Sequence, residues 1–138
     1  MTALALDASV LAKLFLREHD SPSAFALVSS RAPLVAPEHV AVEVASAISR
    51  RHRNGAISRA DAALALGQAR RFVFGGDIVL VSDRVLLPRA EEIALDLKHA
   101  LKDCLYIALA EREKCNLVTC DTTLLARAAP TFPFVTPL

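Results

Sequence analysis

Four acidic residues, Asp7, Glu43, Asp103 and Asp121, occupy positions in the sequence that suit a catalytic or metal-binding role. Asp7 and Asp121 each follow a short apolar run that is typical of a strand, and each precedes a helical pattern. Ligands of open parallel sheets bind beyond the carboxyl ends of the strands, so these two side chains would converge if their strands were neighbours. Asp103 stands at or near the start of the most apolar helical segment, and Glu43 lies beside the apolar stripe of another predicted helix.

Each acid taken alone also has a purely structural interpretation. Asp7 and Asp121 could cap helices, Asp103 could be a first-turn acid favoured by the helix dipole, and Glu43 could pair with an arginine. Brought together, however, carboxylates repel one another and raise each other's pKa. A hard divalent cation removes that cost, and an all-oxygen ligand set favours Mg²⁺ or Mn²⁺. Such a site can clamp a phosphodiester and activate a water for its hydrolysis.

The elements that must position these acids alternate between strand and helix, which indicates an α/β fold. Apolar runs predict strands at residues 4–6, 34–36, 78–81, 116–119 and 134–135, the last an edge strand between Pro133 and Pro137. Helical patterns are found at residues 10–16, 21–29, 40–53, from 58, from Pro88, and at 104–110, where the segment is apolar almost all round.

Composition sets limits on the class of protein. A length of 138 residues, with no repeat or linker, predicts a single domain over 1–138. The net charge of +1 lacks the basic footprint of a protein that coats nucleic acid. A mean hydropathy of +0.38 fits strands covered on both faces or an oligomer interface. No run reaches the ~18 uncharged apolar residues of a membrane span, so we expect a cytoplasmic protein without a membrane partner.

Cysteine and histidine offer no separate metal site by their spacing. Cys104, Cys115 and Cys120 form no C-x-x-C pair, so we expect reduced packing residues rather than a disulfide framework or a thiolate zinc site. The histidines are too scattered along the sequence to suggest a zinc site.

Four segments of the sequence together resemble the VapC-type PIN domains, the toxin ribonucleases of type II toxin–antitoxin systems. They are residues 6–11 (LDASVL), 37–47 (PEHVAVEVASA), 103–111 (DCLYIALAE) and 118–121 (VTCD). The resemblance spans essentially the whole chain. It implies a three-layer α/β/α sandwich with a parallel five-stranded sheet in the order 3-2-1-4-5, which would make the strands of Asp7 and Asp121 neighbours. It also implies Mg²⁺- or Mn²⁺-dependent endoribonuclease activity.

The same resemblance implies roles for individual residues. Asp7, Asp103 and Asp121 would be the principal metal ligands, and Glu43 a further ligand or the group that orients the attacking water. Ser9 and Thr119 match small hydroxyl residues beside the metal, although each could equally be a capping or strand residue.

Partners follow from the resemblance as well. It implies a VapB-like antitoxin that wraps the toxin and blocks its acidic pocket, and a homodimer that could form larger hetero-oligomers with the antitoxin. An apolar face for such a partner could be formed by Leu11, Leu14, Phe15, Phe25 and Leu27, residues that could instead belong to the core.

The basic residues Arg50, Arg51 and Arg53 could bind the phosphates of an RNA substrate. The default interpretation of such a run is the solvated end of a helix.

Two other functions compete with that of a nuclease. A PIN-like domain could bind a partner without catalysis, although the four acids argue against it. A phosphate-receiver signalling domain would need paired acids after the first strand and a late lysine. In this sequence Ala8 follows Asp7, and no lysine occurs after Lys114.

Overall fold

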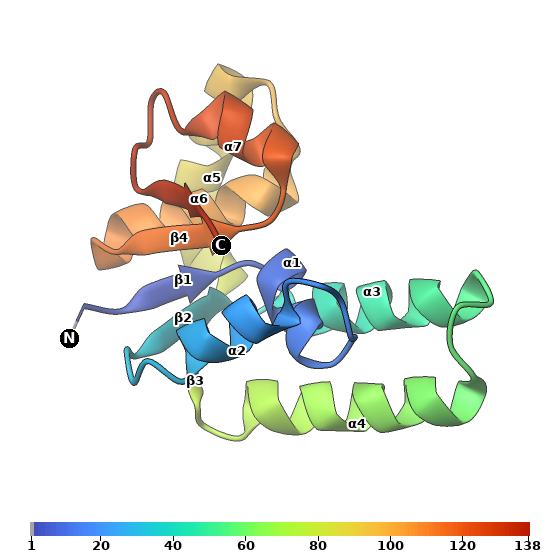
Figure 1. The fold of residues 1–138 in the computed structure, drawn as a ribbon. Coiled ribbons are helices and arrows are strands. Elements are labelled where there is room, and N and C mark those ends of the chain that lie inside the picture. The colour runs from blue at the N-terminus through green and yellow to red at the C-terminus, as the bar shows by residue number, and fades with distance from the viewer. Residues whose placement is uncertain (1) are drawn as a thin grey trace.

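The computed structural model describes residues 2–138, and a five-stranded parallel sheet lies at its centre. The strand order is β3-β2-β1-β4-β5, which confirms the order predicted from the resemblance (Figure 1). The strands are β1 Leu4–Leu6, β2 Leu34–Pro37, β3 Ile78–Val81, β4 Asn116–Thr119 and β5 Val135–Pro137. Leu6 of β1 pairs with Val118 of β4. The residues that follow these two central strands therefore lie at the same end of the sheet.

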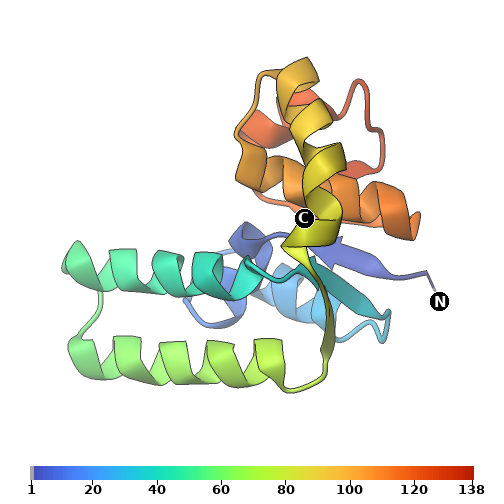
Figure 2. The same cartoon turned by 180° about the vertical axis from the view of Figure 1, so that it is seen from behind.

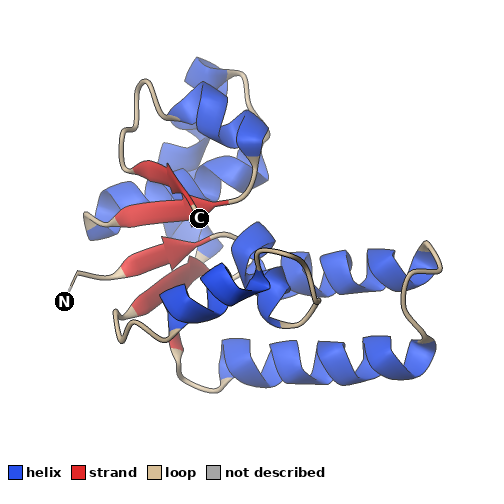
Figure 3. Ribbon diagram, viewed as in Figure 1, coloured by secondary structure: helices blue, strands red, loops and turns tan. Residues whose placement is uncertain are grey.

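Helices cover both faces of the sheet and complete a three-layer α/β/α sandwich (Figure 3). They are α1 Ala8–Leu11, α2 Ser21–Val28, α3 Val40–Arg53, α4 Arg59–Phe74, α5 Asp83–Leu97, α6 Leu101–Glu113, α7 Thr122–Ala128 and the short 3-10 helix η1 Ala12–Leu14. α2 and α7 lie in front of the sheet in Figure 1, and α5 and α6 cover the opposite face, seen in Figure 2. The predicted fold class is therefore confirmed.

Helices α3 and α4 form an antiparallel pair that projects beyond the carboxyl ends of the strands (Figure 1). α3 buries the stripe Val40, Val44 and Ile48 at helical spacing. Ser58 caps α4 by accepting a hydrogen bond from the Asp61 N–H at 3.0 Å. This arrangement sets Glu43, in the first turn of α3, at the end of the sheet where the strands finish.

Helix α6 is the most deeply buried helix of the described residues. Every residue from Cys104 to Ala110 is buried, because α6 packs on β1, β2 and β4 on one side and contacts α5 on another. The all-round apolar pattern of this segment predicted that burial. Asp103 lies in the first turn of the same helix and is half-buried. It lies near the carboxyl edge of the sheet, together with Asp7 and Asp121.

Two predicted helix boundaries are wrong. α5 does not begin at Pro88 but at Asp83, since Ser82 caps it by accepting from the Arg84 N–H at 3.2 Å and Leu86 of its first turns is buried in the core. Pro88 therefore lies inside the helix. The helix expected over residues 10–16 is divided into α1 and η1. The fifth strand is displaced by one residue, to Val135–Pro137, and forms an edge as predicted.

Two further features bear on the class of protein. Within residues 2–138, no helix combines the length and apolar character needed to cross a membrane. The three cysteines are free thiols, with Cys104 and Cys115 buried and Cys120 half-buried.

Candidate active site

The four predicted acids line a single pocket of about 310 Å³ at the carboxyl end of the sheet. Asp7 and Asp121 enter it from the ends of β1 and β4, Glu43 from α3, and Asp103 from α6. The other lining residues are Ala8, Ser9, Ala47, Arg50, Lys102 and Tyr106. The fold thus brings together four carboxyl groups that are far apart along the chain.

Asp7 is the most buried of these acids, with 6% of its surface exposed. Its Oδ1 accepts hydrogen bonds from the Ser9 N–H at 3.0 Å, the Val10 N–H at 3.3 Å and the Ser9 hydroxyl, while its Oδ2 accepts from the Thr119 hydroxyl. No ion pair to Asp7 forms within residues 2–138. Burial raises the pKa of Asp7 above its usual value despite these hydrogen bonds. Asp7 is therefore both the N-cap of α1 and a carboxyl group whose charged form is disfavoured by burial.

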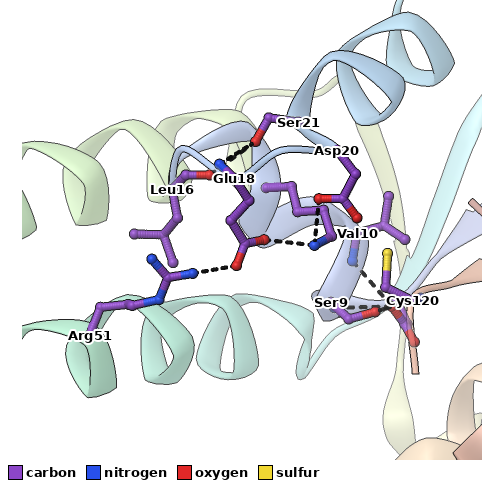
Figure 4. A network of polar contacts seen from close by, with 10 residues as sticks. Ser9, Val10, Leu16, Glu18, Asp20, Ser21, Arg51 and Cys120 are labelled. Atoms are coloured by element: carbon purple, nitrogen blue, oxygen red, sulfur yellow. Dashed lines mark hydrogen bonds and ion pairs between the residues drawn. The ribbon is translucent and has the colours of Figure 1, made fainter. Parts of the chain in front are cut away.

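Two hydroxyl groups tie Asp7 to the neighbouring strand. Ser9 donates to Asp7 and accepts from the Cys120 N–H at 3.0 Å (Figure 4). Thr119 donates to Asp7 and accepts from the Asp121 N–H at 3.0 Å. Both predicted hydroxyl residues thus lie next to the Asp7 carboxylate and fix its orientation.

Asp121 and Asp103 each have one oxygen engaged and one without a hydrogen bond among the described residues. Asp121 Oδ1 accepts from the N–H groups of Thr123 and Leu124, both at 3.0 Å, and so caps α7. Asp103 Oδ2 lies 2.8 Å from Nε2 of His99. The structural role of Asp121 as an N-cap therefore leaves its second oxygen able to bind a ligand.

Glu43 is clamped through one oxygen. Its Oε1 accepts from the Tyr106 hydroxyl at 2.7 Å and lies 2.8 Å from His39 Nε2, while Lys102 Nζ is 3.9 Å from Oε2. His39 Nδ1 in turn lies 2.9 Å from Asp83. Although burial acts to raise it, the contacts with His39 and Tyr106 bring the pKa of Glu43 below its usual value. Glu43 is therefore held ionised, with Oε2 as its less restrained oxygen.

Sequence reasoning missed His39, His99 and Tyr106. Each histidine precedes a site acid by four residues, His39 before Glu43 and His99 before Asp103. That spacing was a usable signal. Tyr106 gave none, because its hydroxyl reaches Glu43 across 63 residues of sequence.

The donor set of the pocket suits a hard, hydrated cation. Among residues 2–138, no group of three or more His, Cys, Asp or Glu side chains is arranged to hold a metal ion directly. Burial raises the pKa of the nearby Cys104 thiol to about 11, so it supplies no thiolate. The pocket instead offers carboxylate oxygens, and Mg²⁺ keeps several waters and is bound by only one or two carboxylates. The residues present fit that mode of binding rather than a closed cage.

The three candidate RNA-binding arginines have different environments. Arg50 lines the acidic pocket. Arg51 forms an ion pair with Glu18, in the segment between η1 and α2 (Figure 4). Arg53 lines a groove between α3 and α4, which Arg50 also lines. Of the three arginines, Arg51 is therefore the one set apart, by its ion pair.

The predicted apolar face for a partner is reduced in the structure. Leu11 has no exposed surface, because α1 packs into the core, so the alternative that it belongs to the core is confirmed. Phe25 is 52% exposed, and Leu14, Phe15 and Leu27 are half-buried. Phe25, Leu14 and Phe15 line one hollow beside η1.

The raised pKa of Asp7 predicts how pH affects the metal-free protein. Since its folded pKa lies above the ordinary 3.8, its contribution to stability falls as pH rises through the window between those two values, and stays low above it. Asp7→Asn removes this contribution and adds a pH-independent offset from altered hydrogen bonds. In urea unfolding measured in EDTA, the free energy of unfolding of Asp7→Asn should increase relative to that of wild type as pH rises from about 4. Asp61→Asn, at an exposed position, should show no such trend. A pH-independent difference for Asp7→Asn would contradict this account.

Comparison with known proteins identifies the family. The family model of the PIN domain matches residues 4–129. The chain belongs to the PIN domain family. This PIN domain has no significant match among curated protein sequences.

Solved structures resemble this PIN domain over nearly its full length. VapC20 of Mycobacterium tuberculosis, described as a Sarcin-Ricin loop cleaving toxin, has a TM-score of 0.71 at 18% identity, over 96% of this chain and 98% of that one. PAE2754 from Pyrobaculum aerophilum has a TM-score of 0.73 at 20% identity, over 99% and 83%. A toxin–antitoxin complex from Klebsiella pneumoniae has a TM-score of 0.66 at 17% identity, over 91% and 92%. At these identities the likeness is one of fold.

Proposed function

We propose that this PIN domain protein is a Mg²⁺- or Mn²⁺-dependent endoribonuclease and the toxin of a toxin–antitoxin pair, with residues 1–138 as its single catalytic domain. The observation that carries the proposal is the convergence of four carboxyl groups on one pocket, where Asp7 is buried without an ion-pair partner among the described residues. A charge of this kind is costly unless a cation offsets it. The PIN family match and the resemblance to a toxin described as cleaving the Sarcin-Ricin loop support RNA as substrate.

In this proposal Asp7, Asp103 and Asp121 would hold the cation, directly or through its water ligands, and Glu43 would either hold it too or orient the attacking water. A bound divalent cation lowers the pKa of that water and neutralises charge on the phosphodiester. Ser9 and Thr119 keep the Asp7 carboxylate in one orientation through their hydrogen bonds.

The remaining pocket residues act on Glu43 and on the substrate. His39 and Tyr106 fix Oε1 of Glu43, which leaves Oε2 available to hold the cation or to orient the attacking water. Lys102 and Arg50 supply the positive charge of the pocket and would attract the phosphate.

We further propose an antitoxin as the protein partner, consistent with the toxin–antitoxin complex among the structural neighbours. The hollow beside η1, with Leu14, Phe15 and Phe25, offers such a partner apolar surface. A homodimer would cover other exposed apolar residues, among them Val79 at the sheet edge and Leu95 on α5, which are 60% and 79% exposed.

Removal of the cation tests the catalytic part of the proposal. Purified protein should cut single-stranded RNA with Mg²⁺ or Mn²⁺, lose this activity in excess EDTA, and recover it when either ion is added back. The readout is fragment formation on a denaturing gel, with matched ionic strength in every sample. Cleavage that persists undiminished in EDTA would refute a metal-dependent mechanism. No cleavage under any of these conditions would favour a non-catalytic binding domain.

A further inference from the structure

A second hollow, of about 600 Å³, lies between α3 and α4 beside the acidic pocket. Small residues, among them Ala41, Ala45 and Ala69, leave it open. Three arginines line it: Arg50 and Arg53 from α3 and Arg70 from α4. No acidic residue is among those that line it, so the α3–α4 groove carries a net positive charge.

The arginines of the α3–α4 groove are exposed, and two of them, Arg53 and Arg70, lie outside the acidic pocket. Within residues 2–138 none of the three forms an ion pair with a carboxylate, in contrast to Arg51, which is bound to Glu18. Neighbouring cations without counter-charges repel one another, and an anionic ligand would relieve that repulsion. The pattern therefore points to a polyanion.

Arg50 joins the α3–α4 groove to the acidic pocket, because its side chain lines both hollows. A strand cut in the pocket must leave it, and its phosphates are repelled by the carboxylates there. An acidic protein segment could satisfy the arginines alone. Only a strand that passes through the pocket would be expected to use both hollows.

Exposed apolar side chains complete the groove. Phe74 at the end of α4 is 62% exposed and Val42 on α3 is 68% exposed, and both line it. A groove that combines positive charges for the backbone with an aromatic ring for base stacking is the usual way to bind a single strand without sequence preference.

We propose that the RNA strand being cut leaves the acidic pocket past Arg50 and runs along the α3–α4 groove. In that path Arg53 and Arg70 bind phosphates and Phe74 stacks on a base. This inference rests on the proposed ribonuclease function and names where its substrate binds. It also separates Arg53 and Arg70 from Arg51, whose charge is already paired.

The salt dependence of binding tests the path without any need for hydrolysis. The probe is a fluorescent 12-nucleotide single-stranded RNA, titrated in EDTA at several salt concentrations. Because each phosphate contact to a single strand contributes about 0.7 to the slope of log K against log salt, Arg53→Ala/Arg70→Ala should make the slope shallower by about 1.4. Arg53→Lys/Arg70→Lys should restore it. Phe74→Ala should weaken binding about fivefold or more with the slope unchanged.

A matched control and the cleavage reaction separate the outcomes. Arg112→Ala, an exposed arginine on α6 outside the groove, should leave the slope unchanged. In Mg²⁺, the double alanine variant should raise KM for the 12-nucleotide RNA, whereas Arg112→Ala should leave KM and kcat within about twofold of wild type. An unchanged slope with normal cleavage would overturn the groove path and leave the groove to a protein partner. Absence of wild-type cleavage would instead refute the proposed function.

Discussion

Asp7→Asn should reduce RNA cleavage by about a hundredfold or more while the protein remains folded. Metal-supplied stabilisation of a transition state is worth several kcal/mol, and each ~1.4 kcal/mol is a factor of ten in rate. Asn keeps the shape of Asp but removes the charge that the pocket would offer a cation. Its side-chain oxygen can still accept from the Ser9 and Val10 N–H groups, so the cap of α1 is retained. The measurement is kcat/KM on one RNA at saturating Mg²⁺.

Two further variants make this result specific. Asp121→Asn should show a loss of similar size, since Asp121 lines the same pocket. Asp61→Asn, at the exposed start of α4, removes the same charge elsewhere and should cleave like wild type. Thermal unfolding of all three shows whether the fold survives. Full activity in folded Asp7→Asn would remove the basis of the proposed mechanism.

Leu109→Ala should lower the free energy of unfolding by about 2–5 kcal/mol, a large part of the ~5–15 kcal/mol typical of a domain. Leu109 has no exposed surface and lies on α6, which packs against the three central strands. Truncation leaves a cavity that the surrounding residues fill only in part. Urea unfolding should show a lower midpoint with an unchanged slope.

The control for Leu109→Ala is the same substitution at a surface position. Leu64 on α4 is 59% exposed, so Leu64→Ala should change stability by less than about 0.5 kcal/mol. If the two substitutions cost the same, α6 does not form the buried centre of the domain.

Much of the fold could be predicted because local pattern and tertiary structure agree. The apolar runs at residues 4–6, 78–81 and 116–119 are β1, β3 and β4 at their predicted bounds, and the all-round apolar segment from Cys104 is the buried helix α6. The order of the strands came from the resemblance to a family, since apolar runs do not reveal which strands are neighbours. The start of α5 was predicted wrongly at Pro88 because proline is commonest in the first turn of a helix. In the structure α5 begins earlier, at Asp83, since Ser82 caps it and Leu86 is buried in the core.

In the candidate site, too, some residues could be predicted from local sequence and others only from the tertiary structure. The acids could be chosen from their positions, which for Asp7 and Asp121 are after strands. Asp103 stands at or near the start of a helix, and Glu43 lies beside an apolar helical stripe. The partners of these acids could not be chosen in this way, since the contact of Tyr106 with Glu43 and that of His39 with Asp83 join residues brought together only by the sheet order. The basic run after Ser49 likewise reads as one cluster in sequence, yet Arg51 faces Glu18 while Arg53 lines the α3–α4 groove.

The bond from Thr119 to Asp7 spans 112 residues and has a consequence for biosynthesis. A ribosome releases β1, Ser9 and α3 first, whereas the Thr119 hydroxyl that also orients Asp7, and the carboxyl groups of Asp103 and Asp121, emerge later. A nascent chain that stops before β4 lacks Asp121 and the Thr119 hydroxyl. The acidic pocket can therefore be completed only after β4 and Asp121 have been synthesised.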